Sequence, residues 1–190
     1  TGLTGSSLLK YLLNDDYYST IIAFVRKAIS EKNIKLIQHI IDFEKLHEYS
    51  SLIKGEDVFC CLGTTIKKAG SRKEFRKVDL EFPLKIAELS MNNGAEKFLL
   101  ISSIGADKNS KIFYSRTKGE VEDKINQLKF GSVFIFRPSL LLGSRDEFRP
   151  GEKIGEIFTK IFGFLFFGKL KKYQPIKAAV VAAAMLNSAK

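Results

Sequence analysis

Tyr114 and Lys118, four residues apart, are the pair in this sequence best suited to acid–base chemistry. On a helix, residues at i and i+4 lie on one face, one above the other. An ammonium beside a phenol stabilises the phenolate, which eases proton exchange. Ser102 or Ser103, upstream of the pair, could hydrogen-bond a substrate carbonyl while Tyr114 exchanges a proton with it. Because this spacing is also common on ordinary helix surfaces, it predicts a site only together with its surroundings.

The residues around this pair predict a strand, a short loop and a helix. Residues 98–101 form a short apolar run, which Ser102, Ser103 and Gly105 interrupt. The helical pattern resumes near Tyr114. This arrangement places the two serines at the carboxyl end of a buried strand, next to the start of the helix that carries Tyr114.

The rest of the chain continues this alternation. Apolar runs predict strands at residues 20–25, 35–41, 58–63 and 132–136, and helices are expected over residues 6–13, 46–53, 74–92 and 178–186. Pro83 should kink the third of these helices. The alternation predicts an α/β fold with a doubly wound parallel sheet, in which ligands bind beyond the carboxyl ends of the strands. Residues that could bind a ligand or take part in catalysis lie at those ends, namely Gly2, Gly5, Arg26, Asp42, Gly63, Ser103 and Pro138.

Two glycines, Gly2 and Gly5, open the first helix. A glycine turn at a helix start offers free backbone N–H groups and the positive end of the helix dipole to a pyrophosphate. A tight turn without any ligand accounts for two glycines equally well. Because such a turn normally follows a strand and none precedes this one, we expect the first strand of the sheet to be absent from this chain.

Composition indicates a globular protein. The chain has 190 residues, 45% of them hydrophobic and 27% charged, which predicts a single domain over residues 1–190. A net charge of +10 raises the question of anionic partners, but the basic residues are scattered and no nucleic-acid or zinc motif is visible, so neither nucleic acid nor metal is expected. Cys60 and Cys61 are adjacent in an apolar run and predict reduced thiols. With no secretory leader pattern, we expect a cytoplasmic location.

Residues 157–167 contain five of the sixteen phenylalanines. This stretch is too short and too interrupted for a membrane span, so stable membrane insertion is not expected. A core helix with a loop accounts for it, as does an apolar wall beside a substrate. We expect residues 144–176 to form the substrate side of the domain, with residues 162–167 selecting apolar substrates.

Several segments together give the chain a family resemblance: TGLTG, FCCLGTT, SSIGADK, YSRTKGEVE and FRPSLLLG. With these, nearly the whole chain resembles the atypical branch of the short-chain dehydrogenase/reductase superfamily. The resemblance implies a Rossmann-like fold in which Tyr114 donates the proton, Lys118 also binds the nicotinamide ribose, and Ser103 orients the carbonyl. The residues it implies for the cofactor are Thr1, Gly2, Leu3 and Thr4 at the pyrophosphate, Arg26 and Lys27 at the 2′-phosphate, Asp42 and Phe43 at the adenine, Leu62 and Gly63 along the path to the nicotinamide, and Leu141 and Arg149 in the rest of the cleft.

The function expected from these residues is reduction of an apolar carbonyl or enone with NADP(H). Arg26 and Lys27 favour NADP(H) over NAD(H), because no carboxylate follows the strand at residues 20–25 until Glu31. The alternative is an NADP(H)-binding sensor or protein-interaction module with little turnover. Whether the protein forms a homo-oligomer is left open. One departure from the family is Asp79, at the position where many members carry an Asn of a proton relay.

Overall fold

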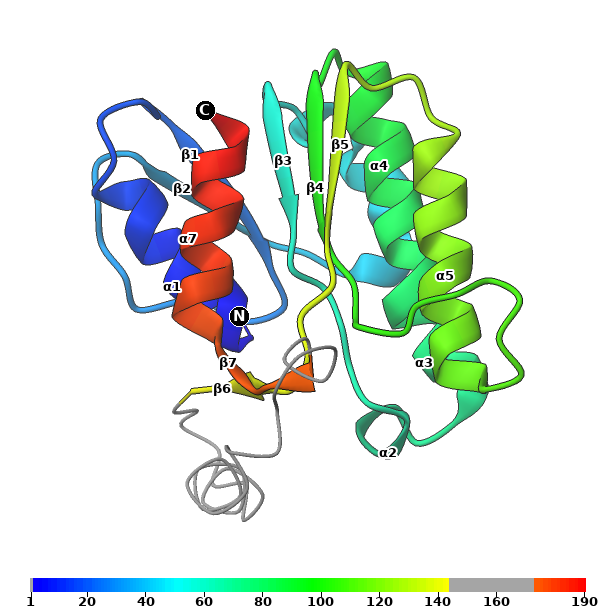
Figure 1. Ribbon diagram of the computed structural model, residues 1–190. Helices are drawn as coiled ribbons and strands as arrows, with labels where there is room; N and C mark the ends of the chain where they lie inside the picture. The colour runs from blue at the N-terminus through cyan, green and yellow to red at the C-terminus, as the bar shows by residue number, and fades with distance from the viewer. Residues whose placement is uncertain (1, 144–172) are drawn as a thin grey trace.

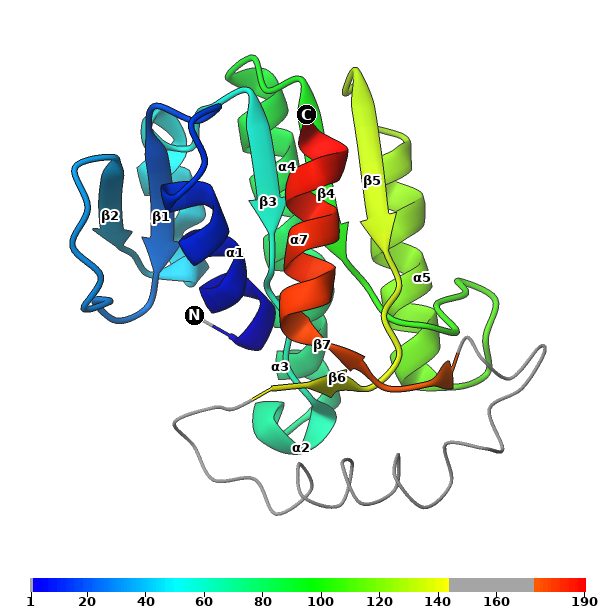
Figure 2. The ribbon, with the colours of Figure 1, turned by 60° about the vertical axis from the view of Figure 1, so that its left-hand side comes forward.

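The computed structural model describes residues 2–143 and 173–190. Its main strands lie side by side in the order β2, β1, β3, β4, β5 (Figure 2). Every strand pairing is parallel. The strands are β1 (Ile21–Val25), β2 (Leu36–Ile40), β3 (Asp57–Cys60), β4 (Lys97–Ile101) and β5 (Ser132–Phe136). The predicted doubly wound α/β fold is confirmed.

The sheet is divided between β1 and β3. Strand β1 pairs with β2, and β3 pairs with β4, but no strand in the described part of the chain joins the two groups. In a doubly wound sheet of order 3-2-1-4-5, this place belongs to the first strand.

Helices cover both faces of the sheet (Figure 1). Helices α1 (Leu3–Leu13) and α7 (Ala178–Ala189) pack together on one face, and η1 (Phe43–Leu52, a 3₁₀ helix), α4 (Phe82–Asn92) and α5 (Phe113–Asn126) lie on the other. Each face of the sheet has its own hydrophobic core, and β4 contributes side chains to both, since successive side chains of a strand point to opposite faces. Leu99 and Ile101 pack with α1 and α7, whereas Phe98 and Leu100 pack with α4 and α5.

The helix predicted over residues 74–92 is interrupted before its proline. It consists of α3 (Arg72–Arg76), a π-helical turn η2 (Lys77–Glu81) and α4. Pro83 has no N–H, and its ring crowds the carbonyl four residues earlier, at Asp79. The Phe82 N–H donates to the Lys77 carbonyl, five residues back. The expected kink is thus taken up as a widened turn centred on Asp79.

Two small features complete the described fold. Helix α2 (Ile66–Ala69) forms within a stretch that the sequence predicts as a loop, with the Thr65 hydroxyl accepting the Lys68 N–H at 3.2 Å. Strands β6 (Leu141–Leu142) and β7 (Ile176–Lys177) form a separate parallel pair that leads into α7.

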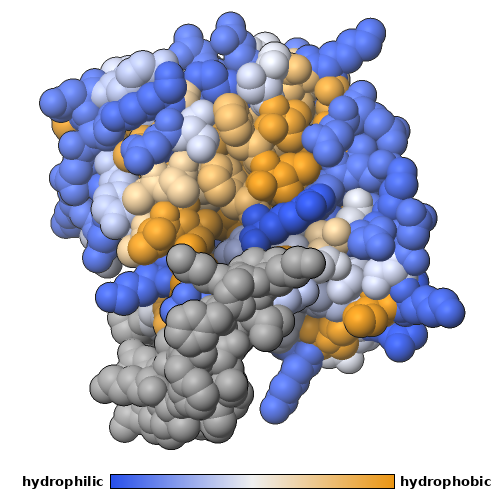
Figure 3. Space-filling view, viewed as in Figure 1, coloured by the Kyte–Doolittle hydropathy of each residue, from blue (hydrophilic) through white to orange (hydrophobic). Residues whose placement is uncertain are grey.

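Apolar side chains gather on the face that α7 shares with the sheet (Figure 3). Val180, in α7, is 52% exposed. Among the described residues, no helix has the length and apolar character that crossing a membrane requires.

Both cysteines are free thiols, as the sequence predicts. Burial raises the pKa of Cys60 to about 11 and also raises the pKa of Cys61. Since only the thiolate reacts, we expect labelling of Cys60 at pH 8 to be roughly 100-fold slower in the folded protein than in urea. Timed alkylation followed by peptide mass spectrometry measures this ratio, and equal rates in the two states would contradict the buried placement.

Candidate active site

The carboxyl ends of the parallel strands meet at one edge of the sheet, the lower edge in Figure 2. Arg26 follows β1, and Gly63 lies three residues beyond β3. Ser102 follows β4 directly, and its N–H donates to the Phe136 carbonyl at 2.8 Å, at the end of β5. The N-terminus of α1 lies at this same edge. The elements thus gather most of the predicted residues along one side of the sheet.

The start of α1 is suited to an anion. Gly2 is its N-cap, in extended conformation, and no side chain caps the helix. The first turn carries no acidic residue. Thr4 is only 4% exposed, yet its hydroxyl has no hydrogen-bond partner among the described residues. Because the first N–H groups of a helix have no partner within it, a bound anion can take up these donors together with the Thr4 hydroxyl. The residues present therefore fit a pyrophosphate; Thr1 lies outside the described residues.

Close contacts fix this helix start against its neighbours. A Cβ placed on Gly5 would lie 3.4 Å from the Cβ of Cys61, after β3. A Cβ on Gly143 would lie 3.1 Å from Leu3 Cδ2. Leu141, in β6, is half-buried and packs against the core that α1 shares with α7. The predicted pyrophosphate and cleft residues of α1 and β6 therefore come together, while Arg149 lies outside the described residues.

The predicted adenine end of the cleft lies beyond β1 and β2. Arg26 and Lys27 are exposed, and neither forms a hydrogen bond or ion pair with any other described residue. Asp42 accepts the Glu44 N–H at 3.0 Å as the N-cap of η1. The ring of Phe43 packs in the core against Phe82, so contact with an adenine would come from its backbone and from Asp42.

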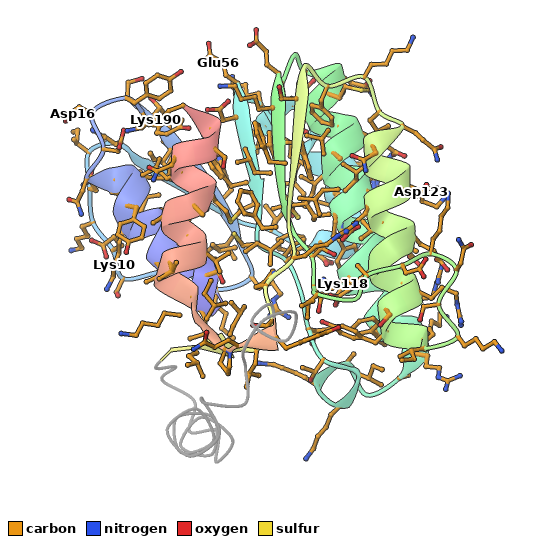
Figure 4. All side chains as sticks on the ribbon, in the orientation of Figure 1. Lys10, Asp16, Glu56, Lys118, Asp123 and Lys190 are labelled. Atoms are coloured by element: carbon orange, nitrogen blue, oxygen red, sulfur yellow. The ribbon has the colours of Figure 1, made fainter. Side chains whose placement is uncertain are left out.

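A buried ion pair lies beneath the exposed Gly63. Lys118 Nζ is 2.7 Å from Asp79 Oδ1, with side chains only 5% and 0% exposed. Asp79 Oδ2 accepts the Thr64 N–H at 2.9 Å. A Cβ on Gly63 would lie 3.5 Å from Asp79 Oδ1 and 3.9 Å from Lys118 Nζ. Figure 4 shows Lys118 in the interior between α5 and the strands, unlike Lys10 or Lys190 at the periphery. Burial raises the pKa of Asp79, and the Lys118 charge and the Thr64 N–H oppose that rise.

Tyr114 lies one turn before Lys118 on α5. Its half-buried ring packs against the fully buried Phe75 of α3, with ring centroids 5.4 Å apart. Within the described part of the chain, its hydroxyl has no hydrogen-bond partner. The phenol is therefore held by α3 and keeps its hydroxyl available.

The two candidate serines differ in their surroundings. Ser102 is 5% exposed, and its hydroxyl has no hydrogen-bond partner in the part of the chain that the structure describes. Ser103 is half-buried, and its hydroxyl donates to the Ile104 carbonyl at 3.3 Å, a long hydrogen bond. Ser103 is more accessible to a substrate, whereas the hydroxyl of Ser102 is the one without a hydrogen bond to a described residue, so both remain candidates.

The loop after β4 rests on the backbone of α5 at Gly119, a contact that the sequence analysis missed. A Cβ on Gly119 would lie 2.1 Å from the Lys108 N and 2.2 Å from the Asp107 carbonyl carbon. The Asp107 N–H donates to the Ser115 carbonyl at 3.1 Å. Since this loop starts at the serines and this helix carries Tyr114 and Lys118, the contact sets their spacing. The only available signal was the glycine beside Lys118 within a helical pattern.

With this geometry in place, comparison with known proteins identifies relatives. No protein-family model matches the chain. The rat protein HTATIP2 is 42% identical over 192 residues, which span 99% of this chain and 77% of the relative. The chain belongs to the HTATIP2 family. The fmp52 protein of Aspergillus niger, described as mitochondrial, is 32% identical over 195 residues and covers 99% of this chain and 83% of its own length. The expected membership of the atypical short-chain dehydrogenase/reductases is confirmed.

Solved structures show the same fold. MoeE5, solved with UDP-glucose and NAD, superimposes with a TM-score of 0.73 at 15% identity, over 100% of this chain and 69% of its own. The Bordetella bronchiseptica enzyme WbmH, solved with NAD⁺, gives a TM-score of 0.74 at 12% identity, over 99% and 69%. At these identities the likeness concerns the fold, and the fold is that of a Rossmann-like short-chain dehydrogenase/reductase.

One prediction is wrong and others fall outside the described residues. Fungal relatives from Aspergillus niger and Candida albicans are described as mitochondrial, which overturns the expected cytoplasmic location. The sequence carried no signal against it, because thiol state and an absent leader pattern do not distinguish reducing compartments. The phenylalanine-rich stretch and all but residues 173–176 of the predicted substrate-side segment lie outside the described residues. Among the described residues, no group of His, Cys, Asp or Glu could hold a metal ion.

Proposed function

We propose that this protein is an oxidoreductase that uses NADP(H) on a small apolar carbonyl or enone. The observation that carries the proposal is the meeting of three features at one sheet edge: the uncapped start of α1, the exposed Gly63 above Lys118, and Tyr114 one turn away on α5. Family membership supports the oxidoreductase class. We further propose one domain over residues 1–190, with residues 144–176 on the substrate side.

The cofactor would supply or accept the hydride, and this chain would hold it along the sheet edge. Residues 1–4 would bind the pyrophosphate through backbone N–H groups and the Thr4 hydroxyl. Leu62 and Gly63 would let the cofactor pass close to the backbone, since Gly63 has no side chain. Lys118 has three donors, of which one faces Asp79, so its other N–H groups would remain for the ribose.

Proton transfer falls to Tyr114. Its ring is held by Phe75, so its hydroxyl keeps one place relative to α5. The hydroxyl would give its proton to the carbonyl oxygen during reduction and take it back during oxidation. Ser103 would hydrogen-bond the same oxygen and stabilise the charge that develops on it, or Ser102 would, since its hydroxyl has no partner within residues 2–143 and 173–190.

The preference for NADP(H) rests on Arg26. Neighbouring structures were solved with NAD, which supports a nicotinamide dinucleotide but not the phosphorylated form. Arg26 is exposed and has no partner within the described residues. Its planar guanidinium matches a phosphate, and one such charge-assisted bond contributes roughly 1.5–3 kcal/mol. At about 1.4 kcal/mol per decade, that predicts at least a tenfold preference for NADPH over NADH.

Fluorescence titration with NADPH and NADH tests this preference. We expect Arg26→Asp to lose the preference or reverse it, because a carboxylate repels the 2′-phosphate and accepts hydrogen bonds from a free ribose. Lys32→Asp, an equal change of charge at another exposed position after β1, should leave the ratio unchanged. Equal affinities in the parent protein, or an Arg26→Asp variant that still prefers NADPH, would contradict the assignment.

Turnover itself is tested by a panel of apolar aldehydes, ketones and enones, with NADPH consumption as the readout. We expect at least one class to be reduced. Tight NADPH binding without turnover on any of them would instead favour a cofactor sensor.

A further inference from the structure

Positive charge is concentrated on α2 and α3. Residues 66–77 contain six basic residues and one acidic residue, a net charge of +5, which is half of the +10 of the whole chain. Helix α2 contacts α3, and both lie beside the start of α5 at the lower edge of the molecule in Figure 1. Much of the excess charge of the chain is therefore carried by one small part of the fold.

The acidic side chains near these helices already pair with other cations. Glu74 Oε1 is 3.4 Å from Lys77 Nζ, and Glu120 Oε2 is 2.7 Å from Arg76 Nη1. Four exposed cations form no ion pair with any residue that the structure describes; together they form what we call the basic surface, and they are Lys67, Arg72, Lys73 and Lys111. Because like charges repel each other, an anionic partner that binds the basic surface relieves this repulsion.

Arg72 is held in a position suited to a carboxylate. Its Cζ lies 5.1 Å from the centroid of the Phe113 ring, the first residue of α5. A guanidinium over an aromatic ring keeps the N–H groups of its edge, which match a carboxylate in two parallel hydrogen bonds. Phe113 packs in turn against the fully buried Phe75, with ring centroids 5.7 Å apart. The same Phe75 ring contacts Tyr114, so the basic surface adjoins the candidate active site.

The exposed apolar side chains of this region indicate which anionic partner it fits. Ile66, at the start of α2, is 40% exposed, and Ile112, directly before α5, is 66% exposed. Both are aliphatic, whereas single-stranded nucleic acid is bound by stacking on aromatic rings. A membrane surface is bound by an amphipathic helix with a continuous apolar face, which helices of four and five residues do not provide. Cations with isolated isoleucines beside them fit a peptide that carries both carboxylates and apolar side chains.

We propose that the basic surface binds an acidic segment of a partner protein. Carboxylates of the segment pair with the basic surface, and apolar side chains of the segment contact Ile66 and Ile112. Such a contact needs no turnover, so it goes beyond the proposed reaction and does not depend on it.

Fluorescence anisotropy with a labelled peptide tests this binding. The probe is a dodecapeptide of glutamate, serine and leucine, and its neutral counterpart has glutamine in place of every glutamate. We expect the acidic peptide to bind the full chain at least about tenfold more tightly than the neutral one at low salt. Added salt should weaken its binding, because exposed charge pairs are screened. Equal affinities for the two peptides would overturn the proposal.

Combining Lys67→Gln, Arg72→Gln and Lys73→Gln removes three charges from the basic surface. An exposed charge pair contributes a factor of roughly two to five in affinity, so the triple variant should bind the acidic peptide about tenfold or more weakly than the parent. An unchanged affinity would contradict the proposal.

A second triple variant removes the same charge elsewhere. It combines Lys10→Gln, Lys124→Gln and Lys129→Gln, three exposed residues that form no ion pair with any described residue. Lys10 lies at the periphery of α1 (Figure 4), and Lys124 is in the last turn of α5. We expect the affinity for the acidic peptide to stay close to that of the parent. An equal loss in both triple variants would show that net charge alone attracts the peptide, and the basic surface would not be its site.

Chemical-shift mapping on the parent protein locates the peptide without any variant. In ¹⁵N-edited NMR spectra, we expect the acidic peptide to shift the amide signals of residues 66–73 and 111–113 and to leave those of α7 in place. Shifts confined to other parts of the chain would overturn the assignment.

The same triple variants are compared for two other anionic partners, a labelled single-stranded oligonucleotide and vesicles of phosphatidylcholine with phosphatidylserine. We expect the parent to bind both more weakly than the acidic peptide. Tighter binding of the oligonucleotide or the vesicles, lost on removing charge from the basic surface, would replace the acidic segment with nucleic acid or a membrane and refute the proposal.

Discussion

Replacing Tyr114 by phenylalanine is expected to lower turnover roughly 10²- to 10⁴-fold, while the affinity for NADPH stays within a few fold of the parent's. The size of the loss is that of a positioned general acid. The ring stays in place because Phe75 packs against its face and not against its hydroxyl, which has no partner in the described part of the chain. Steady-state rates and fluorescence titration on the same preparation measure both quantities.

Two comparisons make this result interpretable. Tyr11→Phe removes a hydroxyl from a tyrosine that is 38% exposed on α1 and should leave rates unchanged. Lys118→Ala should lower both turnover and NADPH affinity, because Lys118 is proposed to contact the ribose. The substitution also leaves Asp79 as a buried unpaired carboxylate. Full activity of Tyr114→Phe on a substrate that the parent reduces would refute Tyr114 as the proton donor.

The sequence predicts the sheet well because its strands are short apolar runs with clear boundaries. Strand β5 occupies the predicted residues, and β4 begins one residue earlier than predicted. The break in the sheet lies between β1 and β3, the place of the first strand in this topology. These features depend on local composition and on a topology that few alternatives satisfy.

The helices show where local reasoning ends. A kink at Pro83 could be predicted, but whether the chain relaxes by bending or by a π turn depends on what the turn packs against. Here the widened turn lets Asp79 reach Lys118, a tertiary contact between residues 39 positions apart in the chain. The departure at position 79 was visible in the sequence, whereas its ion pair was not.

The candidate site was predicted as a set of residues but not as a geometry. Phe43 was assigned to the cleft through the family resemblance, and its ring packs in the core against Phe82. Phe75 was not singled out, because a buried aromatic on a helix gives no sequence signal of the neighbour it holds. Pairwise packing of this kind is decided by the whole fold.

Gly119 illustrates the same limit and gives the second large expected effect. A methyl group there would meet the Lys108 N at 2.1 Å and the Asp107 carbonyl carbon at 2.2 Å, and both atoms belong to backbone. Backbone cannot rotate away as the end of a side chain can, so the loop after β4 must move as a unit. Overpacking of this kind costs typically 1–3 kcal/mol and occasionally more.

We therefore expect Gly119→Ala to lower the free energy of unfolding by about 3 kcal/mol, which for a chain of this size is a fall of roughly 6–12 °C in melting temperature. Gly5→Ala is the matched control: it is also a helical glycine facing a neighbouring element, but its new methyl would meet Cys61 at an ordinary 3.4 Å. That variant should stay within about 1 kcal/mol of the parent, because alanine also favours the helix. Thermal unfolding followed by circular dichroism, without cofactor, compares the two. If Gly119→Ala melts as high as Gly5→Ala, the loop does not rest on α5 as described, and the spacing between the serines and the Tyr114–Lys118 pair is set in another way.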